Sequence, residues 1–193
     1  MSADPVLATK QNDVQMLNLL LAHMDYFDET LDQYGKTALM AAAQLGNSES
    51  LTALLDHFKS CTKNTDLESY LSIKTIDGFD VLALAAKWGH TGIIDILFTT
   101  ECLKPHLHLF DFKTALQQAA KSGHTDAFMR IVSCEACPAS ITLEVGNELT
   151  DKAPATPVRN LLLSGNYQTV VNQEVIPSLP ATPISTTCLM NKK

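Results

Sequence analysis

The apolar residues of this 193-residue chain recur in blocks, each a run of small residues followed by a stripe of large ones. The run of small residues holds an alanine pair, and a glycine three positions after the pair ends it: Ala42-Ala43 with Gly46, then two further copies ending at Gly89 and Gly123. After each glycine, large apolar residues return every three or four positions, which is the period of a helix with one buried face. The pattern therefore predicts a repeated pair of helices, one short and one amphipathic.

The steps between these glycines set the size of the repeat. Gly89 and Gly123 are 34 residues apart, whereas Gly46 and Gly89 are 43 apart. A period of this size is typical of stacked repeats, in which no single unit can bury its apolar face alone. The longer step predicts an insertion of about nine residues. Its Thr65-x-x-Glu68 pattern has the form of a capping box, which favours a short helix over residues 65–72 rather than a flexible loop.

Other residues of the copies resemble a known family. Thr37-Ala38-Leu39 and Thr114-Ala115-Leu116 each stand five positions before an alanine pair, and an Asp32-x-x-Gly35 turn opens the first copy. With the 34-residue step, these residues resemble the ankyrin repeat, a unit of about 33 residues with a T-P-L-H-x-A signature. The resemblance covers about residues 1–137. It implies an all-α ankyrin-repeat solenoid of stacked helix-turn-helix units, in which His90 and His124, directly after two of the glycines, have a structural role.

In this frame the chain divides into six segments. They are a partial N-terminal capping repeat (1–31), a repeat with an insertion at about 56–74 (32–74), a repeat (75–108), a repeat with its connection (109–150), a degenerate C-terminal repeat (151–175) and a disordered tail (176–193). The degenerate repeat rests on Thr156-Pro157-Val158 and Gly165, and a loosely ordered segment with an accidental match is the alternative. The tail contains Pro-x-x-Pro spacings among Pro177, Pro180 and Pro183, which fit either a disordered end or a ligand for an aromatic groove.

Composition and charge argue against several classes of function. A formal net charge of −7 without a cluster of Lys and Arg argues against nucleic-acid binding and is compatible with a partly basic partner. No apolar run reaches the roughly 18–20 residues of a membrane span, and the N-terminus lacks the basic region of a signal peptide. Five scattered cysteines fit a reducing compartment better than a disulfide framework. We therefore expect a cytoplasmic monomer.

Few residues form a pattern that could carry chemistry. Cys134-x-x-Cys137 has the spacing of a metal or redox site, and His106-x-His108 could add two ligands for zinc. His57 and Cys61 lie four apart on one helix face, as a thiolate–imidazole pair requires, but no orienting third group accompanies them. The eight glycines are dispersed rather than gathered in a phosphate-binding loop. We expect no catalysis, cofactor or small-molecule substrate.

The resemblance to ankyrin repeats implies a binding surface made of the turns and the exposed side of the first helices. The matching positions are Gln33, Tyr34, Lys36, Gln44 and Leu45 in the first full copy, Ile76, Asp77, Phe79, Lys87 and Trp88 in the second, and Phe110, Asp111, Lys113, Lys121 and Ser122 in the third. Large aromatic residues are enriched at the centres of protein interfaces. Tyr34, Phe79, Trp88 and Phe110 are therefore expected to bind a partner. The alternative is that Trp88 and Phe110 pack against the neighbouring repeat as core.

These observations favour a non-catalytic protein–protein interaction module or adaptor. One alternative is an effector of an intracellular bacterium that acts on host proteins in the host cytosol, since irregular spacing and a polar C-terminus are found in such ankyrin proteins. The other alternative is a zinc- or thiol-dependent activity at Cys134 and Cys137. The sequence does not identify the partner, because solenoid binding faces carry no general code.

Overall fold

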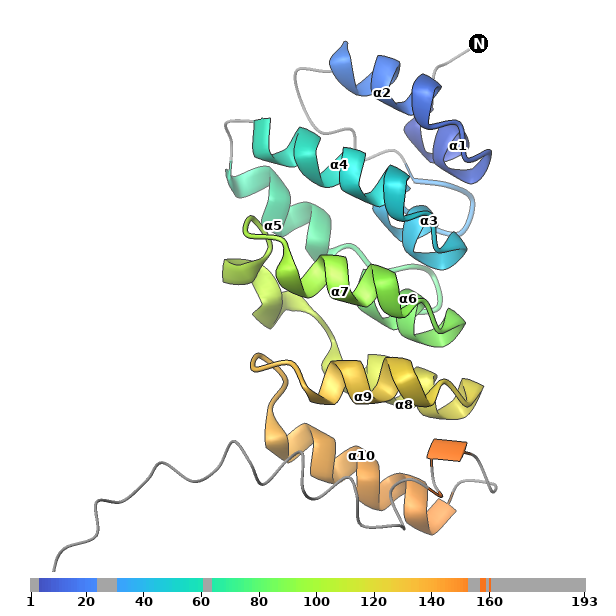
Figure 1. The fold of residues 1–193 in the computed structure, drawn as a ribbon, viewed down its shortest axis with the longest axis vertical. Helices are drawn as coiled ribbons and strands as arrows, with labels where there is room; N and C mark the ends of the chain where they lie inside the picture. The colour runs from blue at the N-terminus through green and yellow to red at the C-terminus, as the bar shows by residue number, and fades with distance from the viewer. Residues whose placement is uncertain (1–3, 24–30, 61–63, 153–156, 159, 161–193) are drawn as a thin grey trace, which may run out of the picture.

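The computed structural model describes residues 4–23, 31–60, 64–152, 157–158 and 160. Their helices and turns form one elongated stack (Figure 1). The helices are α1 (Pro5–Lys10), α2 (Val14–Ala22), α3 (Ala38–Leu45), α4 (Ser48–Ser60), α5 (Asn64–Ser72), α6 (Val81–Trp88), α7 (Thr91–Thr99), α8 (Phe112–Ser122), α9 (Thr125–Val132) and α10 (Ala139–Lys152), with a 3₁₀ helix, η1 (Lys104–Leu109). No strand occurs in these ranges. The predicted all-α solenoid is confirmed.

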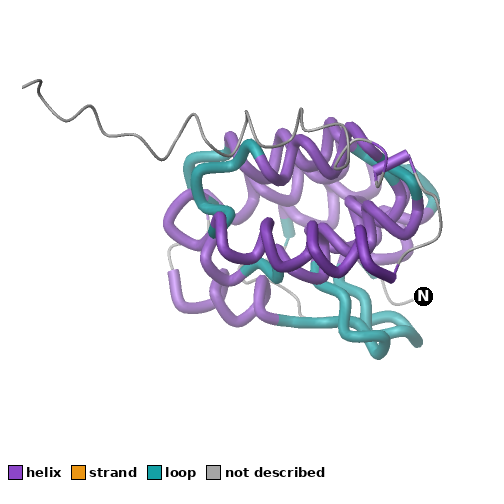
Figure 2. The backbone as a smooth tube through the Cα atoms, turned by 90° about the horizontal axis from the view of Figure 1, so that it is seen from below, coloured by secondary structure: helices purple, strands orange, loops and turns teal. Residues whose placement is uncertain are grey.

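The helices form two columns that run side by side. The first helices of the pairs pack in the order α1, α3, α6, α8 and α10, and the second helices pack in the order α2, α4, α7 and α9. Each first helix also contacts its own second helix, in the pairs α1–α2, α3–α4, α6–α7 and α8–α9. Figure 2 shows these two layers of helices from the end of the stack, with loops projecting beyond them. Each pair therefore depends on its neighbours to cover its apolar faces.

The ends of the first helices follow from the residues that recur in the sequence. The side chains of Thr37 and Asp80 each accept a hydrogen bond from the backbone N–H three residues later, at 3.2 and 2.7 Å, which caps α3 and α6. Gly46, Gly89 and Gly123 end α3, α6 and α8 with φ angles of 72°, 73° and 79°. This left-handed conformation costs glycine little, because glycine has no Cβ.

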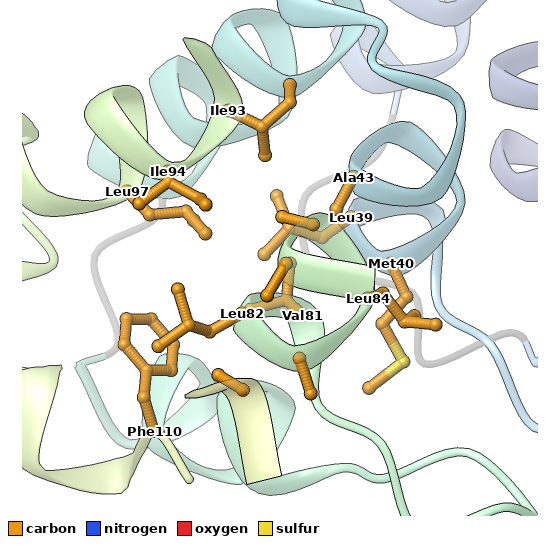
Figure 3. Close-up of a cluster of buried hydrophobic side chains, with 14 of the residues drawn as sticks. Leu39, Met40, Ala43, Val81, Leu82, Leu84, Ile93, Ile94, Leu97 and Phe110 are labelled. Atoms are coloured by element: carbon orange, nitrogen blue, oxygen red, sulfur yellow. The ribbon is translucent and has the colours of Figure 1, made fainter. Parts of the chain in front are cut away.

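The core lies between the two columns. All six alanines of the pairs are fully buried, which allows the first helices to pack closely on one another. Large side chains from the second helices, including Ile93, Ile94 and Leu97 of α7, point toward Leu39 and Leu82 of the first helices (Figure 3). Most of the driving force for stacking comes from these buried groups, at about 25 cal/mol per Å² of apolar surface.

The insertion forms the predicted helix. The sequence placed it at 65–72, and α5 spans Asn64–Ser72. Leu67, Tyr70 and Leu71 are buried at helical spacing, and the Tyr70 ring meets that of Phe58 edge to face with centroids 5.0 Å apart. The Tyr70 hydroxyl accepts the backbone N–H of Leu39 at 3.3 Å, in the first turn of α3. The insertion is thus part of the core rather than a loop on its surface.

The third copy departs from the expected frame. Where the first two copies have a glycine turn, this copy has η1, and α8 begins at Phe112, three residues before the position that matches Val81. Phe112 stands at the turn-glycine position and is buried, with its ring stacked on Phe98 at a centroid distance of 6.2 Å. A bulky apolar residue at that position packs into the core, so the chain continues as helix instead of forming a turn.

The C-terminal part of the described chain also differs from the prediction. The helix α10 crosses the expected boundary at 150/151 and packs on α8, as each earlier first helix packs on the one before it. Pro157 lies beside Gly123, as His90 and His124 lie beside the two preceding glycines. Pro157 therefore lies beside the end of α8, and the predicted degenerate repeat at 151–175 falls mostly outside the described residues. Residues 161–193, with the Pro-x-x-Pro spacings, lie outside the described residues. No described helix is long and apolar enough to span a membrane.

Candidate protein-interaction surface

Two finger turns, residues 32–36 and 75–79, precede α3 and α6. Each is closed by a backbone hydrogen bond between its ends: Asp32 N–H to Lys36 O at 3.0 Å, and Thr75 N–H to Phe79 O at 2.9 Å. The Asp32 carboxylate also accepts the N–H groups of Tyr34 and Lys36, at 2.8 and 2.9 Å. Loops project away from the helices beside the first-helix layer (Figure 2). Hydrogen bonds between residues of the same turn therefore fix the shape of each turn.

The tips of the finger turns carry large exposed apolar groups. The exposed fractions are 53% for Tyr34 and 78% for Ile76. The backbone N–H of Ile76 donates to the carbonyl of Tyr34 at 3.1 Å, which joins the two turns. A Cβ on Gly35 would lie 3.5 Å from the Ile76 nitrogen, so the turns are in van der Waals contact. The two tips therefore form a fixed apolar edge.

A second apolar pair lies at the ends of α3 and α6. Leu45 and Trp88 each precede the helix-ending glycine, and their exposed fractions are 46% and 51%. Because α3 packs on α6, these equivalent positions are one layer apart in the stack. The Nε2 atom of His90 lies 3.1 Å from the carbonyl oxygen of Gln44, and the His90 ring contacts Gly46. The expected structural role of this histidine is confirmed by these contacts.

Lysine ammonium groups lie over the aromatic rings of this surface. The Lys87 Nζ of α6 is 4.6 Å from the ring centroid of Phe79 in the second finger turn, and the Lys36 Nζ is 4.8 Å from that of Tyr34. Both distances fall within the range of cation–π attraction. Phe79 is half-buried and packs against the core. The contact of Lys87 with the Phe79 ring therefore joins the end of α6 to the second finger turn. The contact between Lys87 and Phe79 could not be foreseen from the sequence, because Lys87 lies at the end of α6 and Phe79 in the turn that precedes this helix.

Two of the predicted third-copy residues do not belong to this surface. Phe110 is only 4% exposed and points into the cluster that contains Leu82 (Figure 3), so the expectation that it binds a partner is wrong. Lys113 lies within α8 and pairs with Glu144 and Glu148 of α10. Lys121 and Ser122, at the end of α8, are exposed as expected.

Asp111 is a structural residue that joins neighbouring repeats. Its carboxylate caps α8 through the Thr114 N–H at 3.0 Å and pairs with Lys74 at 3.0 Å. Its own N–H donates to the buried carboxylate of Asp80 at 2.6 Å. Burial acts to raise the pKa of Asp111, but the hydrogen bonds from Thr114 and Lys74 outweigh it and the pKa is lowered. Burial dominates at Asp80, and its pKa is raised.

The residues considered for chemistry are dispersed. Within the described residues, no group of three or more His, Cys, Asp or Glu side chains could hold a metal ion, so His106 and His108 do not complete a site at Cys134 and Cys137. Burial raises the pKa of the Cys137 thiol, which disfavours the reactive thiolate. A hollow of about 570 Å³ beside Cys134 is lined by η1, α7 and α9 and lies away from the finger turns. Burial lowers the pKa of His57, and Cys61 lies outside the described residues.

The comparison with protein families agrees with this architecture. Residues 6–66 match a family model described as ankyrin repeats (3 copies). Residues 6–66 therefore consist of ankyrin repeats. The matched residues include the first finger turn and reach into α5, and the same layered pairs continue beyond them as α6–α7 and α8–α9. Ankyrin repeats are generally protein–protein interaction modules. No curated protein matches the chain.

Proposed function

We propose that this protein is a non-catalytic interaction module that binds a protein partner through one surface, called here the finger face. It consists of the finger turns, the exposed ends of α3 and α6, and the adjoining end of α8. The observation that carries the proposal is that exposed large apolar residues occupy equivalent positions in two successive layers: Tyr34 and Ile76, whose turns share a hydrogen bond, and Leu45 and Trp88.

The apolar residues of the finger face differ from ordinary exposed apolar residues in how they are held. Single exposed leucines on a surface need no explanation, but a continuous apolar patch marks an interaction site. The finger turns are joined by a backbone hydrogen bond, and the helix ends are fixed by packing of α3 on α6. Binding to such a pre-organised surface loses little conformational entropy.

The experiment compares two pairs of apolar truncations in a partner-capture assay with a lysate of the source cells. In the test variant Ile76 and Trp88 are both changed to alanine. In the control variant Met16 and Leu19, which are similarly exposed on α2, are both changed to alanine. The proposal expects the test variant to lose a protein that wild type and control retain. All three proteins should unfold within about 3 °C of one another, since surface changes are worth roughly 0.5 kcal/mol or less.

Equal capture by the test variant and wild type would contradict the proposal. A fall in melting temperature of many degrees for the test variant alone would also count against it, because Trp88 would then be a core residue. The two outcomes are distinguished by measuring capture and thermal unfolding on the same samples.

A further inference from the structure

The cations of this chain are not distributed evenly between paired and unpaired positions. Among the Lys and Arg side chains that the structure describes, six lie within 4.0 Å of a carboxylate: Lys10, Lys59, Lys74, Lys104, Lys113 and Arg130. Among the lysines whose side chains the structure describes, Lys36, Lys87 and Lys121 have no carboxylate in that range. All three belong to the finger face. The lysines elsewhere on the described surface are neutralised by neighbours.

The unpaired lysines stand beside the exposed apolar residues. Lys87 and Lys121 occupy equivalent positions at the ends of α6 and α8, two residues before the glycine. Lys87 directly precedes Trp88, and Lys36 lies over the ring of Tyr34. The acidic group Asp32 of this face pairs with Lys10, and Asp111, at the start of α8, pairs with Lys74. Asp77, at the tip of the second finger turn, is exposed.

The local charge of the finger face is thus opposite in sign to the net charge of the chain. The formal net charge of −7 would by itself suggest a basic partner. Charges close to a binding partner determine its orientation and specificity, whereas distant charges are screened beyond about 8–10 Å at physiological salt. Positive ammonium groups next to exposed apolar groups favour a ligand that carries carboxylates next to apolar side chains.

We propose that the finger face binds an acidic segment of a protein partner, in which aspartate or glutamate flanks one or more large apolar residues. The apolar residues lie against Trp88, Leu45 and the finger tips, and the carboxylates pair with Lys36, Lys87 and Lys121. This inference rests on the proposed function, since it names the chemistry of the partner that the same surface would take.

The test selects a random peptide library, displayed on phage, against the immobilised full-length chain. The inference expects the enriched peptides to contain more Asp and Glu than the unselected library, next to aromatic or aliphatic residues. An enriched synthetic peptide is then titrated against wild type and two charge-reversal variants. The test variant is Lys87→Glu with Lys121→Glu, and the control is Lys59→Glu with Lys104→Glu, which changes the net charge equally on helices α4 and η1.

The test variant should bind the acidic peptide about tenfold or more weakly than wild type, and the control variant should bind within about twofold. Raising the salt concentration from about 0.1 M to 0.5 M should weaken wild-type binding and leave the test variant less affected. A Lys87→Gln and Lys121→Gln variant, with less perturbation of the fold, should give an intermediate loss. Thermal unfolding of each variant identifies any that fail to fold.

Enrichment of neutral or basic peptides, or equal affinity for the test variant, would overturn the inference. If those peptides lose binding on Trp88→Ala, the proposed finger face stands and only its preference for acidic ligands is wrong. If binding is unaffected by changing both Trp88 and Ile76 to alanine, both proposals are contradicted. A library that yields no binder counts against the acidic-segment inference, and the partner-capture assay then decides the proposed function.

Discussion

The backbone N–H of Ile76 donates to the carbonyl of Tyr34 at 3.1 Å, so two finger turns from different repeats share a hydrogen bond. This bond sets the distance between two exposed apolar side chains that are 42 residues apart in the sequence. In the free protein the apolar edge is already in place, which reduces the ordering cost of binding. The stability of the stack and the binding geometry are therefore linked through the same backbone contacts.

The glycine that ends α6 is expected to tolerate alanine less well than the glycine in the second finger turn. Gly78 has a φ of 80°, and no atom lies within 4 Å of the place that a Cβ would take, so Gly78→Ala should cost about 1–2 kcal/mol from backbone strain alone. At Gly89, a Cβ would lie 2.6 Å from Nδ1 of His124. Gly89→Ala should therefore cost about 1–3 kcal/mol more, measured by urea unfolding.

The double variant Gly89→Ala with His124→Ala separates the two contributions. Removing the imidazole should relieve the clash, so the double variant should be more stable than the sum of the single changes predicts. Strict additivity of the three free energies of unfolding would show that His124 does not restrict this site.

Tyr70 is expected to stabilise the protein through both its ring and its hydroxyl group. Tyr70→Phe removes the acceptor for the Leu39 N–H in the first turn of α3, which should cost about 1 kcal/mol. Tyr70→Ala also leaves a cavity beside Phe58 and should cost about 3–5 kcal/mol. Chemical denaturation measures both values. If Tyr70→Phe leaves the free energy of unfolding unchanged, the hydroxyl does not cap α3.

The two linked aspartates should affect the pH dependence of stability in opposite directions. The pKa of Asp111 in the folded protein lies below its ordinary value of 3.8, so the ionised form stabilises the fold above that pH. This contribution is lost as the pH falls through the folded pKa. The stability advantage of wild type over Asp111→Asn should therefore shrink as the pH is lowered from 6 to about 3.

Asp80 has a raised pKa, so its protonated form is favoured in the folded state. Its contribution is fully present below the ordinary value of 3.8 and is lost as the pH rises through the folded pKa. Wild type should therefore gain stability relative to Asp80→Asn as the pH falls toward about 4. Urea unfolding of the three proteins at several pH values measures both effects, and parallel curves for wild type and either variant would contradict the assignment for that residue.

The sequence predicts those features of the fold that depend on neighbouring residues in the chain, and it does not predict those that depend on contacts between repeats. The alanine pairs and glycines act locally, so the register of the first helices and the helix at 65–72 could be predicted. The burial of Phe110 could be stated only as an alternative, because the sequence does not show that η1 replaces the finger turn and carries that residue into the core of the neighbouring repeats. The helix α10 could not be predicted either, because Ile141 and Val145 form only a sparse apolar stripe, without an alanine pair or a closing glycine.

The local charge of the finger face could not be predicted from the sequence either. Net charge is additive along the chain, but pairing depends on contacts between residues such as Lys10 and Asp32, 22 positions apart. The repeat pattern predicts that Lys36, Lys87 and Lys121 lie at the surface, and none of the three is buried. Their lack of carboxylate neighbours follows only from the stacking of the repeats.

Cys137 is expected to be unreactive. Burial raises the pKa of its thiol, which lowers the thiolate fraction at neutral pH. Iodoacetamide at pH 7.5 should alkylate Cys137 in the folded protein about tenfold or more slowly than in the protein unfolded by guanidinium, with sites located by peptide mass spectrometry. Faster alkylation of folded Cys137 would favour the thiol-dependent activity instead.

Trp88 is the only tryptophan of the chain, so it can report directly on the finger face. Incorporation of 5-fluorotryptophan places a single ¹⁹F label there without interference from tryptophans of a partner. Titration with the protein that wild type captures should shift or broaden this resonance, and the change should saturate together with binding. A resonance that stays unchanged at saturation would contradict the claim that Trp88 lies in the interface.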